Sequence, residues 1–269
     1  MTAPFKLFYQ TYGNPSHPPI LFLHGFLGSH RDWESIISQC LPNYFSIAVD
    51  LPGHGKSPIS GSIMTFSLCT DALEAVLKDL GSLKPLAVGY SMGGRLLLWT
   101  AIHRPHLFSR ILLESVHPGI EEEKEQDQRI QSDALLSQKL KVMPFNDFLR
   151  YWYRSSMFAS LVQTPDALES IIRLRLDNNP EELSQALKYL GTGRQQPLWG
   201  ELKNLNIPVH LLAGVLDEHY VRIARRIKNI LPESSLHLIP KTGHNIHLEN
   251  PKEFCLHLHN FLTLEFNTH

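Results

Sequence analysis

A serine flanked by glycines is the most chemically distinctive feature of this sequence. The segment Gly89-Tyr90-Ser91-Met92-Gly93 follows the apolar run Leu86–Val88 and opens a stretch with helical spacing. In the pattern G-x-S-x-G the serine occupies a sharp strand-to-helix turn, which small neighbours make sterically possible. The turn exposes the hydroxyl of Ser91 and leaves the N–H of Met92 at a helix N-terminus, where it can stabilise an oxyanion. The pattern predicts a reactive serine beside an oxyanion-binding amide.

A serine hydroxyl is a weak nucleophile or base unless it is paired with an imidazole that a carboxylate holds in place. Two later segments offer these groups. Asp217 comes shortly after the apolar run Val209–Ala213, and His244 comes shortly after the run Leu236–Ile239. Parallel strands present their carboxyl ends at one edge of a sheet, where residues that follow them can meet. We therefore predict a catalytic triad of Ser91, Asp217 and His244.

A cation follows the serine by one helical turn. Arg95 is four residues after Ser91, which places both residues on the same face of the expected helix. The helix dipole disfavours a positive charge in the first turn. A site for a neutral substrate gains nothing from this arginine, whereas a site for a carboxylate gains a charged donor. We predict that Arg95 binds a substrate carboxylate; the alternative is a surface arginine that reaches solvent.

The elements needed to position these residues are visible as alternating strand-like and helix-like segments. The strand candidates are Ile20–Leu23, Phe45–Val49, Leu86–Tyr90, Ile111–Leu113, Val209–Ala213 and Leu236–Ile239. The helix candidates are Phe66–Leu80, Met92–His103, Tyr220–Leu231 and Lys252–Phe266. This alternation predicts an α/β fold with a mostly parallel central sheet covered by helices on both faces. Residues Phe5–Tyr12 are expected to add antiparallel strands at one edge, and Phe26, just after the first parallel strand, is expected to supply a second oxyanion N–H.

A stretch without strand-like segments separates the two parts of this alternating pattern. Between residues 119 and 202 helix-favouring segments dominate, namely Glu121–Lys141, Phe145–Phe158, Pro165–Leu176 and Pro180–Leu190. The strand pattern resumes after residue 202. We interpret residues 119–202 as a helical cap inserted after the sixth strand of one domain, whose core is formed by residues 1–118 and 203–269.

Composition limits the possible partners and surroundings. The 269 residues carry a formal net charge of −1, and no basic run occurs, which argues against nucleic acid or an anionic membrane surface as the partner. The three cysteines are widely spaced and form no C-x-x-C pair, so we expect no disulfide scaffold. The N-terminal segment lacks the pattern of a secretory signal, and no apolar run approaches the ~20 residues of a membrane helix. We expect a cytoplasmic location.

Fifteen histidines raise the question of a metal site. The closely spaced pairs are His103 and His106, His244 and His247, and His257 and His259. No cluster of cysteines or carboxylates at ligand spacing accompanies them, and His244 is already assigned to the triad. The glycines of residues 89–94 do not have the spacing of a dinucleotide-binding loop. We therefore expect no metal and no cofactor.

The motifs resemble those of known enzymes. The segments Leu23–Gly28, Asp50–Ser57, Gly89–Gly94 and Gly243–Asn245 are similar to the α/β-hydrolase superfamily. A more specific resemblance to the 2-succinyl-6-hydroxy-2,4-cyclohexadiene-1-carboxylate synthases of menaquinone or phylloquinone biosynthesis rests on Gly89–Arg95, His117-Pro118-Gly119, Trp152-Tyr153, Phe158–Leu161, Arg175 and Gly243–Asn245.

This resemblance implies a lyase of the α/β-hydrolase superfamily. The expected reaction eliminates pyruvate from 2-succinyl-5-enolpyruvyl-6-hydroxy-3-cyclohexene-1-carboxylate and leaves the cyclohexadiene product. The resemblance further implies that Arg95, Arg129 and Arg175 bind the carboxylates of this small-molecule substrate, with Tyr90 and Trp152 lining the pocket. Arg173 and Arg194 are alternatives to Arg129, because the acidic stretch before Arg129 leaves its register open.

The leading hypothesis for the chemistry is proton abstraction assisted by the triad. Ser91, deprotonated by His244, removes a ring proton, and the Phe26 and Met92 amides stabilise the developing oxyanion. Two alternatives remain open from the sequence. One is a C–C or ester hydrolase that uses Ser91 covalently. The other is a binding protein without catalytic activity, because a complete triad can be present in a protein that only binds a ligand.

Overall fold

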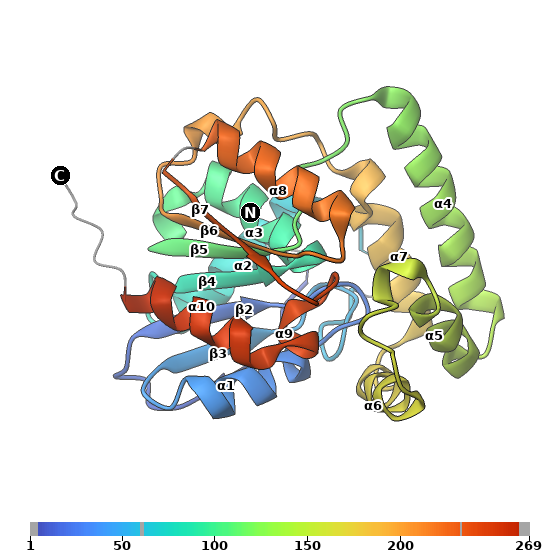
Figure 1. The fold of residues 1–269 in the computed structure, drawn as a ribbon, viewed down its shortest axis with the longest axis horizontal. Helices are drawn as coiled ribbons and strands as arrows, with labels where there is room; N and C mark the ends of the chain where they lie inside the picture. Colours follow the sequence, from blue (N-terminus) through green and yellow to red (C-terminus); the bar gives the residue numbers. More distant parts are fainter. Residues whose placement is uncertain (1–4, 60–61, 232, 264–269) are drawn as a thin grey trace.

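The computed structural model describes residues 5–59, 62–231 and 233–263, and a seven-stranded sheet lies at its centre (Figure 1). The spatial order of the strands is β1-β3-β2-β4-β5-β6-β7. Their bounds are β1 Tyr9–Tyr12, β2 Pro19–Leu23, β3 Phe45–Val49, β4 Leu86–Tyr90, β5 Arg110–Glu114, β6 Val209–Gly214 and β7 Ser235–Ile239. Strand β1 pairs antiparallel with β3, and the other neighbours pair in parallel. The mostly parallel sheet predicted from the sequence is confirmed.

Helices cover both faces of this sheet. The helices of the core are α1 Glu34–Cys40, α2 Phe66–Asp79, α3 Ser91–His103, α8 Glu218–Ile230, α9 Ile246–Glu249 and α10 Pro251–Thr263. The short helix η1, His30–Trp33, precedes α1. Of the expected last helix, Lys252–Phe266, residues 264–266 lie outside the described part of the chain.

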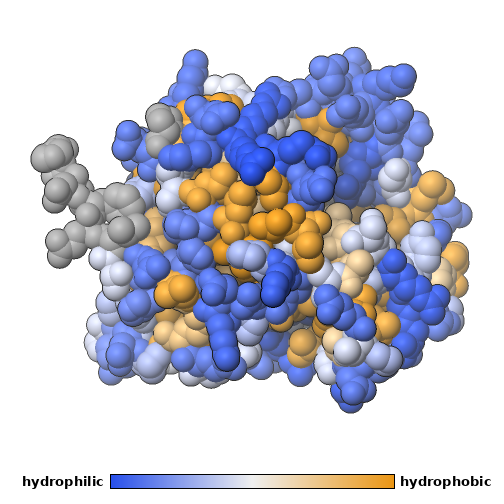
Figure 2. All heavy atoms as spheres, in the orientation of Figure 1, coloured by the Kyte–Doolittle hydropathy of each residue, from blue (hydrophilic) through white to orange (hydrophobic). Residues whose placement is uncertain are grey.

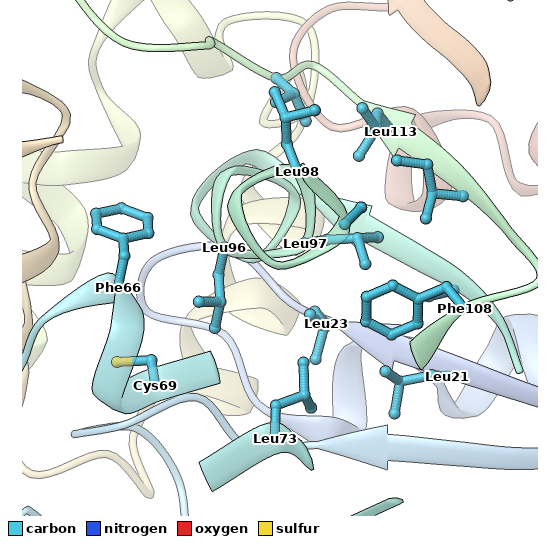
Figure 3. Packing of buried hydrophobic residues seen from close by; sticks show 14 of the residues in the cluster. Leu21, Leu23, Phe66, Cys69, Leu73, Leu96, Leu97, Leu98, Phe108 and Leu113 are labelled. Carbon is cyan, nitrogen blue, oxygen red and sulfur yellow. The ribbon is translucent and has the colours of Figure 1, made fainter. Parts of the chain in front are cut away.

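The strands carry apolar side chains on both faces of the sheet, and helices bury both faces. Successive side chains of a strand point to opposite faces. In β2, Leu21 and Leu23 pack with α2 and α3, as Figure 3 shows around Leu73 and Leu97. Residues Ile20 and Phe22 instead join the cluster that contains residues of α1 and α10. A strand buried on both faces is continuously apolar, which is why these runs are readable in the sequence.

Four further helices lie between β5 and β6 and pack together at one end of the sheet (Figure 1). These cap helices are α4 Glu123–Val142, α5 Phe145–Tyr153, α6 Pro165–Arg175 and α7 Pro180–Leu190. They share a small apolar cluster, which includes Leu140, Phe148, Ile172 and Leu183 and is joined by Leu27 from the loop after β2. In the described sheet the insertion follows the fifth strand and not the sixth, because residues 5–12 contribute the single strand β1 where several antiparallel strands were expected.

The cysteines form one cross-link that the sequence analysis did not anticipate. Cys40 at the end of α1 and Cys255 on α10 form a disulfide, with 5.9 Å between their Cα atoms. The two cysteines are 215 residues apart in the sequence, so their spacing could not predict the disulfide. Burial raises the pKa of the third cysteine, Cys69, which is free and lies in the apolar core. The disulfide joins two helices on one face of the sheet, while the core itself is apolar.

The surface adds two observations. In Figure 2 apolar side chains gather at the centre of the visible face, where the edge strand β7 lies between α8 and α10 in Figure 1. Among the described residues, no helix combines the length and apolar character needed to cross a membrane.

Candidate active site

Ser91 stands at the junction of β4 and α3. The strand ends at Tyr90 and the helix begins at Ser91, whose φ of 47° lies in the left-handed region. A non-glycine residue in this region is strained. The turn also requires close backbone approach, since a Cβ on Gly89 would lie 2.6 Å from the Cα of Gly94. The glycines thus permit the turn that places the hydroxyl of Ser91 at the carboxyl end of β4.

His244 lies within hydrogen-bonding distance of both other predicted triad residues, Asp217 and Ser91. Nδ1 of His244 is 2.7 Å from Oδ2 of Asp217, and Nε2 of His244 is 3.2 Å from Oγ of Ser91. The side chain of His244 is 2% exposed. Asp217 also caps α8, because its Oδ1 accepts a hydrogen bond from the N–H of Tyr220. This geometry can transfer a proton from Ser91 to an imidazole that the carboxylate orients.

Two glutamates hold the backbone around His244, and sequence reasoning missed both. The carboxylate of Glu249 accepts hydrogen bonds from the N–H groups of Gly243 and Asn245, at 2.7 and 3.1 Å. The buried carboxylate of Glu114 accepts the N–H groups of Ile246 and His247. Glu249, five residues after His244, was detectable as a local capping residue, whereas Glu114 comes from a distant strand.

The two predicted oxyanion donors lie at the same place. Met92 is the second residue of α3, so its N–H has no partner inside the helix. Phe26 follows β2 and lines the same cavity as Ser91, Met92 and His244. The strand β2 is the neighbour of β4, which explains why the two segments meet. The positions fit an oxyanion hole built from two backbone amides.

A cavity between the sheet and the cap helices contains this site. Its lining residues are Phe26, Tyr90, Ser91, Met92, Arg95, Arg129, Trp152, Met157, Phe158, Leu187, Gly191, Thr192, Tyr220 and His244. Tyr90 and Trp152 are among the lining residues, and their contact with a substrate stays a prediction. Tyr220, which sequence reasoning missed, contacts the ring of His244 with 4.5 Å between centroids. The free space is about 60 Å³, well below the ~300–1,000 Å³ of ordinary ligand sites.

Two arginines reach this cavity. Arg95 is buried, and its guanidinium donates to Oε1 of Gln195 and to the carbonyl oxygen of Leu190. No described ion pair joins Arg95 to a carboxylate, and burial lowers its pKa to about 10, so that it remains charged at neutral pH. Arg129 donates from Nε to Asp133 at 2.9 Å. The hydrogen-bond partners of Arg95 are neutral, so its buried charge is chemically suited to an anion.

The remaining candidate arginines, Arg175, Arg173 and Arg194, are not among the residues that line this cavity. Arg175 forms a buried ion pair with Asp32, and its Nε donates to the hydroxyl of Tyr153 at 2.9 Å. A direct substrate contact by Arg175 stays a prediction, and it requires the guanidinium to exchange Asp32 for a substrate carboxylate. Arg173 is exposed, and Arg194 lines a separate pocket beside α2 and α3. Of Arg129 and its two alternatives, Arg129 is the one found among the residues that line the cavity with Ser91.

The fold and this constellation define the chain as an α/β hydrolase, and the α/β hydrolase fold family matches residues 18–251. Comparison with individual proteins identifies a family within this superfamily. The chain is 32% identical, over 91% of its length and 90% of the other protein, to a putative 2-succinyl-6-hydroxy-2,4-cyclohexadiene-1-carboxylate synthase of Bacillus subtilis. It is 34% identical to the synthase of Citrobacter koseri, over 89% of this chain and 91% of that protein. The chain belongs to the family of these synthases.

Solved structures agree with this placement. The structure titled MenH from S. aureus superposes with a TM-score of 0.89 at 35% identity, covering 94% of this chain and 97% of the other. A carboxylesterase of Nitrososphaera gargenis superposes with a TM-score of 0.84 at 20% identity, covering 97% of each chain, and shows the shared fold alone.

Proposed function

We propose that this protein is a lyase that eliminates pyruvate from 2-succinyl-5-enolpyruvyl-6-hydroxy-3-cyclohexene-1-carboxylate to give 2-succinyl-6-hydroxy-2,4-cyclohexadiene-1-carboxylate. One observation carries the proposal beyond the family relationship. Arg95 places a buried positive charge with neutral partners in the same cavity as Ser91 and His244. A substrate with several carboxylates uses such a charge, whereas a neutral ester leaves it without a partner.

The triad supplies the base in this reaction. His244, oriented by Asp217, takes the proton of Ser91, and the Ser91 oxygen removes a proton from the ring. The electrons of the broken C–H bond spread into the adjacent carbonyl system, where the Phe26 and Met92 amides stabilise the negative charge. Cleavage of the C–O bond to the enolpyruvyl group then releases the enolate of pyruvate, which takes up a proton.

The arginines position the substrate for this step. Arg95 and Arg129 line the same cavity as the reacting serine, so they can hold carboxylates while one ring proton faces Ser91. Fixing a reactant beside a base removes much of the entropic part of the barrier. The same charges favour a carboxylated small molecule as the substrate. A cytoplasmic location stays a prediction from the cysteine pattern and the N-terminal segment, and the absence of a nucleic-acid partner stays a prediction from charge balance.

The experiment that tests the proposal separates elimination from hydrolysis. The purified protein is mixed rapidly with the cyclohexene substrate, and pyruvate, ring product and covalently modified protein are measured over the first turnover. We expect pyruvate and cyclohexadiene in equal amounts with no acyl-enzyme. A burst of acylated Ser91 would favour the hydrolase alternative, and tight binding without multiple turnovers would favour a binding protein.

A further inference from the structure

Three histidines from three different elements come together outside the active site. His210 is the second residue of β6, His237 is the central residue of β7, and His257 lies on α10. One ring nitrogen from each lies within 4.8 Å of the corresponding nitrogens of the other two. The His237 ring centroid is 4.7 Å from that of His210 and 4.4 Å from that of His257. The grouping follows from the pairing of β6 with β7 and from α10 packing on the same sheet face.

Two nitrogens in this group are buried without a hydrogen-bond partner. His210 is 2% exposed, and its Nδ1 is 2.6 Å from Oγ of Ser235, which leaves Nε2 unpartnered. In His257, Nε2 is 3.9 Å from a carboxylate oxygen of Glu253, and Nδ1 is buried and unpartnered. Buried polar atoms without partners are uncommon in native proteins and require a reason.

The contacts of His210 and His257 are compatible with tautomers in which the unpartnered nitrogens carry lone pairs. When Nδ1 of His210 donates to Oγ of Ser235, Nε2 is left as a bare acceptor. When the proton of His257 is on Nε2, its buried Nδ1 is left bare in the same way. A partner that fixes one ring nitrogen while the other stays free is the usual arrangement around metal-binding histidines. Burial, together with the adjacent histidine rings, lowers the pKa of His210 to about 3 and also lowers that of His257, which keeps both rings neutral.

We propose that His210, His237 and His257 form a binding site for a zinc-type divalent metal ion that joins β6 and β7 to α10. Imidazole ligands suit zinc, nickel and copper, whereas magnesium and calcium prefer oxygen. Ligand bonds of about 2.0–2.1 Å require the three rings to turn inward from their present spacing. His237 and His257 are partly exposed, which gives the ion an entry path and a solvent-derived fourth ligand.

The expected role of the ion is structural. His210 lies near the start of β6, whereas Asp217 follows the end of that strand, so the ion and the triad occupy opposite ends of β6. Because β7 is an edge strand, a metal bridge to α10 would oppose its separation from the sheet. Binding to the folded state alone raises the midpoint of thermal unfolding.

Equilibrium dialysis against micromolar free zinc tests the proposal, after a chelator has removed bound metal from the full-length protein. We expect one bound zinc per chain and an upward shift of the unfolding temperature that magnesium does not produce. H237N and H257N should each weaken zinc binding at least tenfold, and S235A about tenfold through the loss of the partner of His210. H259N, a change at an exposed histidine on the same helix, should bind like the parent protein.

Two controls keep the result interpretable. A C69A variant removes the free thiol and should keep its zinc site. The unfolding temperature of metal-free H237N should match that of the metal-free parent, which separates loss of a ligand from loss of the fold. Equal zinc binding by the parent, H237N and H257N, or no binding by the parent, would overturn the proposal.

Discussion

Arg175 of α6 and Asp32 of η1 form an ion pair whose side chains are only 3% and 1% exposed. The two residues are 143 positions apart, and the pair connects a cap helix to the segment after β2. Tyr153 of α5 adds its hydroxyl as a second acceptor for Arg175. The pair therefore links the cap helices to the core beside the cavity.

Removing the cation of this pair should destabilise the protein strongly. R175M leaves the Asp32 carboxylate buried without its partner, and we expect the free energy of unfolding to fall by about 3–5 kcal/mol in urea denaturation. The double variant D32N/R175M should recover most of this loss, because no buried charge remains. A loss of only about 0–1 kcal/mol in R175M, the value for an exposed pair, would contradict the arrangement.

Substitution of Arg95 should impair substrate binding. Loss of a charge-assisted hydrogen bond of about 1.5–3 kcal/mol predicts that R95Q raises KM by about 10–100-fold. R104Q is the matched control, since Arg104 follows the same helix and pairs with Glu74 and Asp71 at the surface. Steady-state assays of pyruvate release measure both variants. Equal KM values for R95Q and R104Q would remove Arg95 from the carboxylate site.

Stability should fall on the acidic side of neutrality because of His54. This histidine is 1% exposed, and burial lowers its pKa to about 3 in the folded protein, against 6.5 when unfolded. Between these values the unfolded state binds a proton that the folded state does not, so stability falls as pH drops below about 6.5 and is unaffected above it. From pH 6.5 to 5 the group contributes a loss of up to about 2 kcal/mol.

A denaturation series over that pH range tests this contribution. The variant H54Q should lose less stability between pH 7 and pH 5 than the parent protein. Parallel curves for the two proteins would show that His54 does not titrate as its burial implies.

Features fixed by neighbouring residues were predictable from the sequence. The strained turn at Ser91 depends on glycines within four positions, and the strands of the parallel sheet are continuously apolar because both faces are buried. The positions of Asp217 and His244 followed from the rule that parallel strands place their carboxyl ends together. These local and topological constraints were sufficient to predict that Ser91, Asp217 and His244 lie together.

Pairings between distant segments were not predictable in this way. Nothing near Arg175 in the sequence identifies Asp32 as its partner. The two residues form an ion pair only because the fold places them together. Similarly, the search for metal ligands by spacing considered His257 with His259, whereas the structure groups His257 with His210 and His237 from two strands. Which strand residues face the same helix depends on register and packing, and a single sequence does not determine these.

Removing the serine hydroxyl should separate binding from chemistry. S91A removes the proposed base. We expect the rate of pyruvate release to fall by about 10²–10⁴-fold, which is the usual contribution of a general base. Binding of the substrate, measured by calorimetry, should persist because Arg95 and Arg129 are unchanged. A rate of pyruvate release by S91A close to that of the parent protein would exclude Ser91 as the base.

The most direct test of the account is the rate of pyruvate release when the unmodified protein is given the enolpyruvyl cyclohexene substrate. The account predicts multiple turnovers, with one cyclohexadiene formed for each pyruvate. Pyruvate release no faster than the spontaneous decay of the substrate would contradict it.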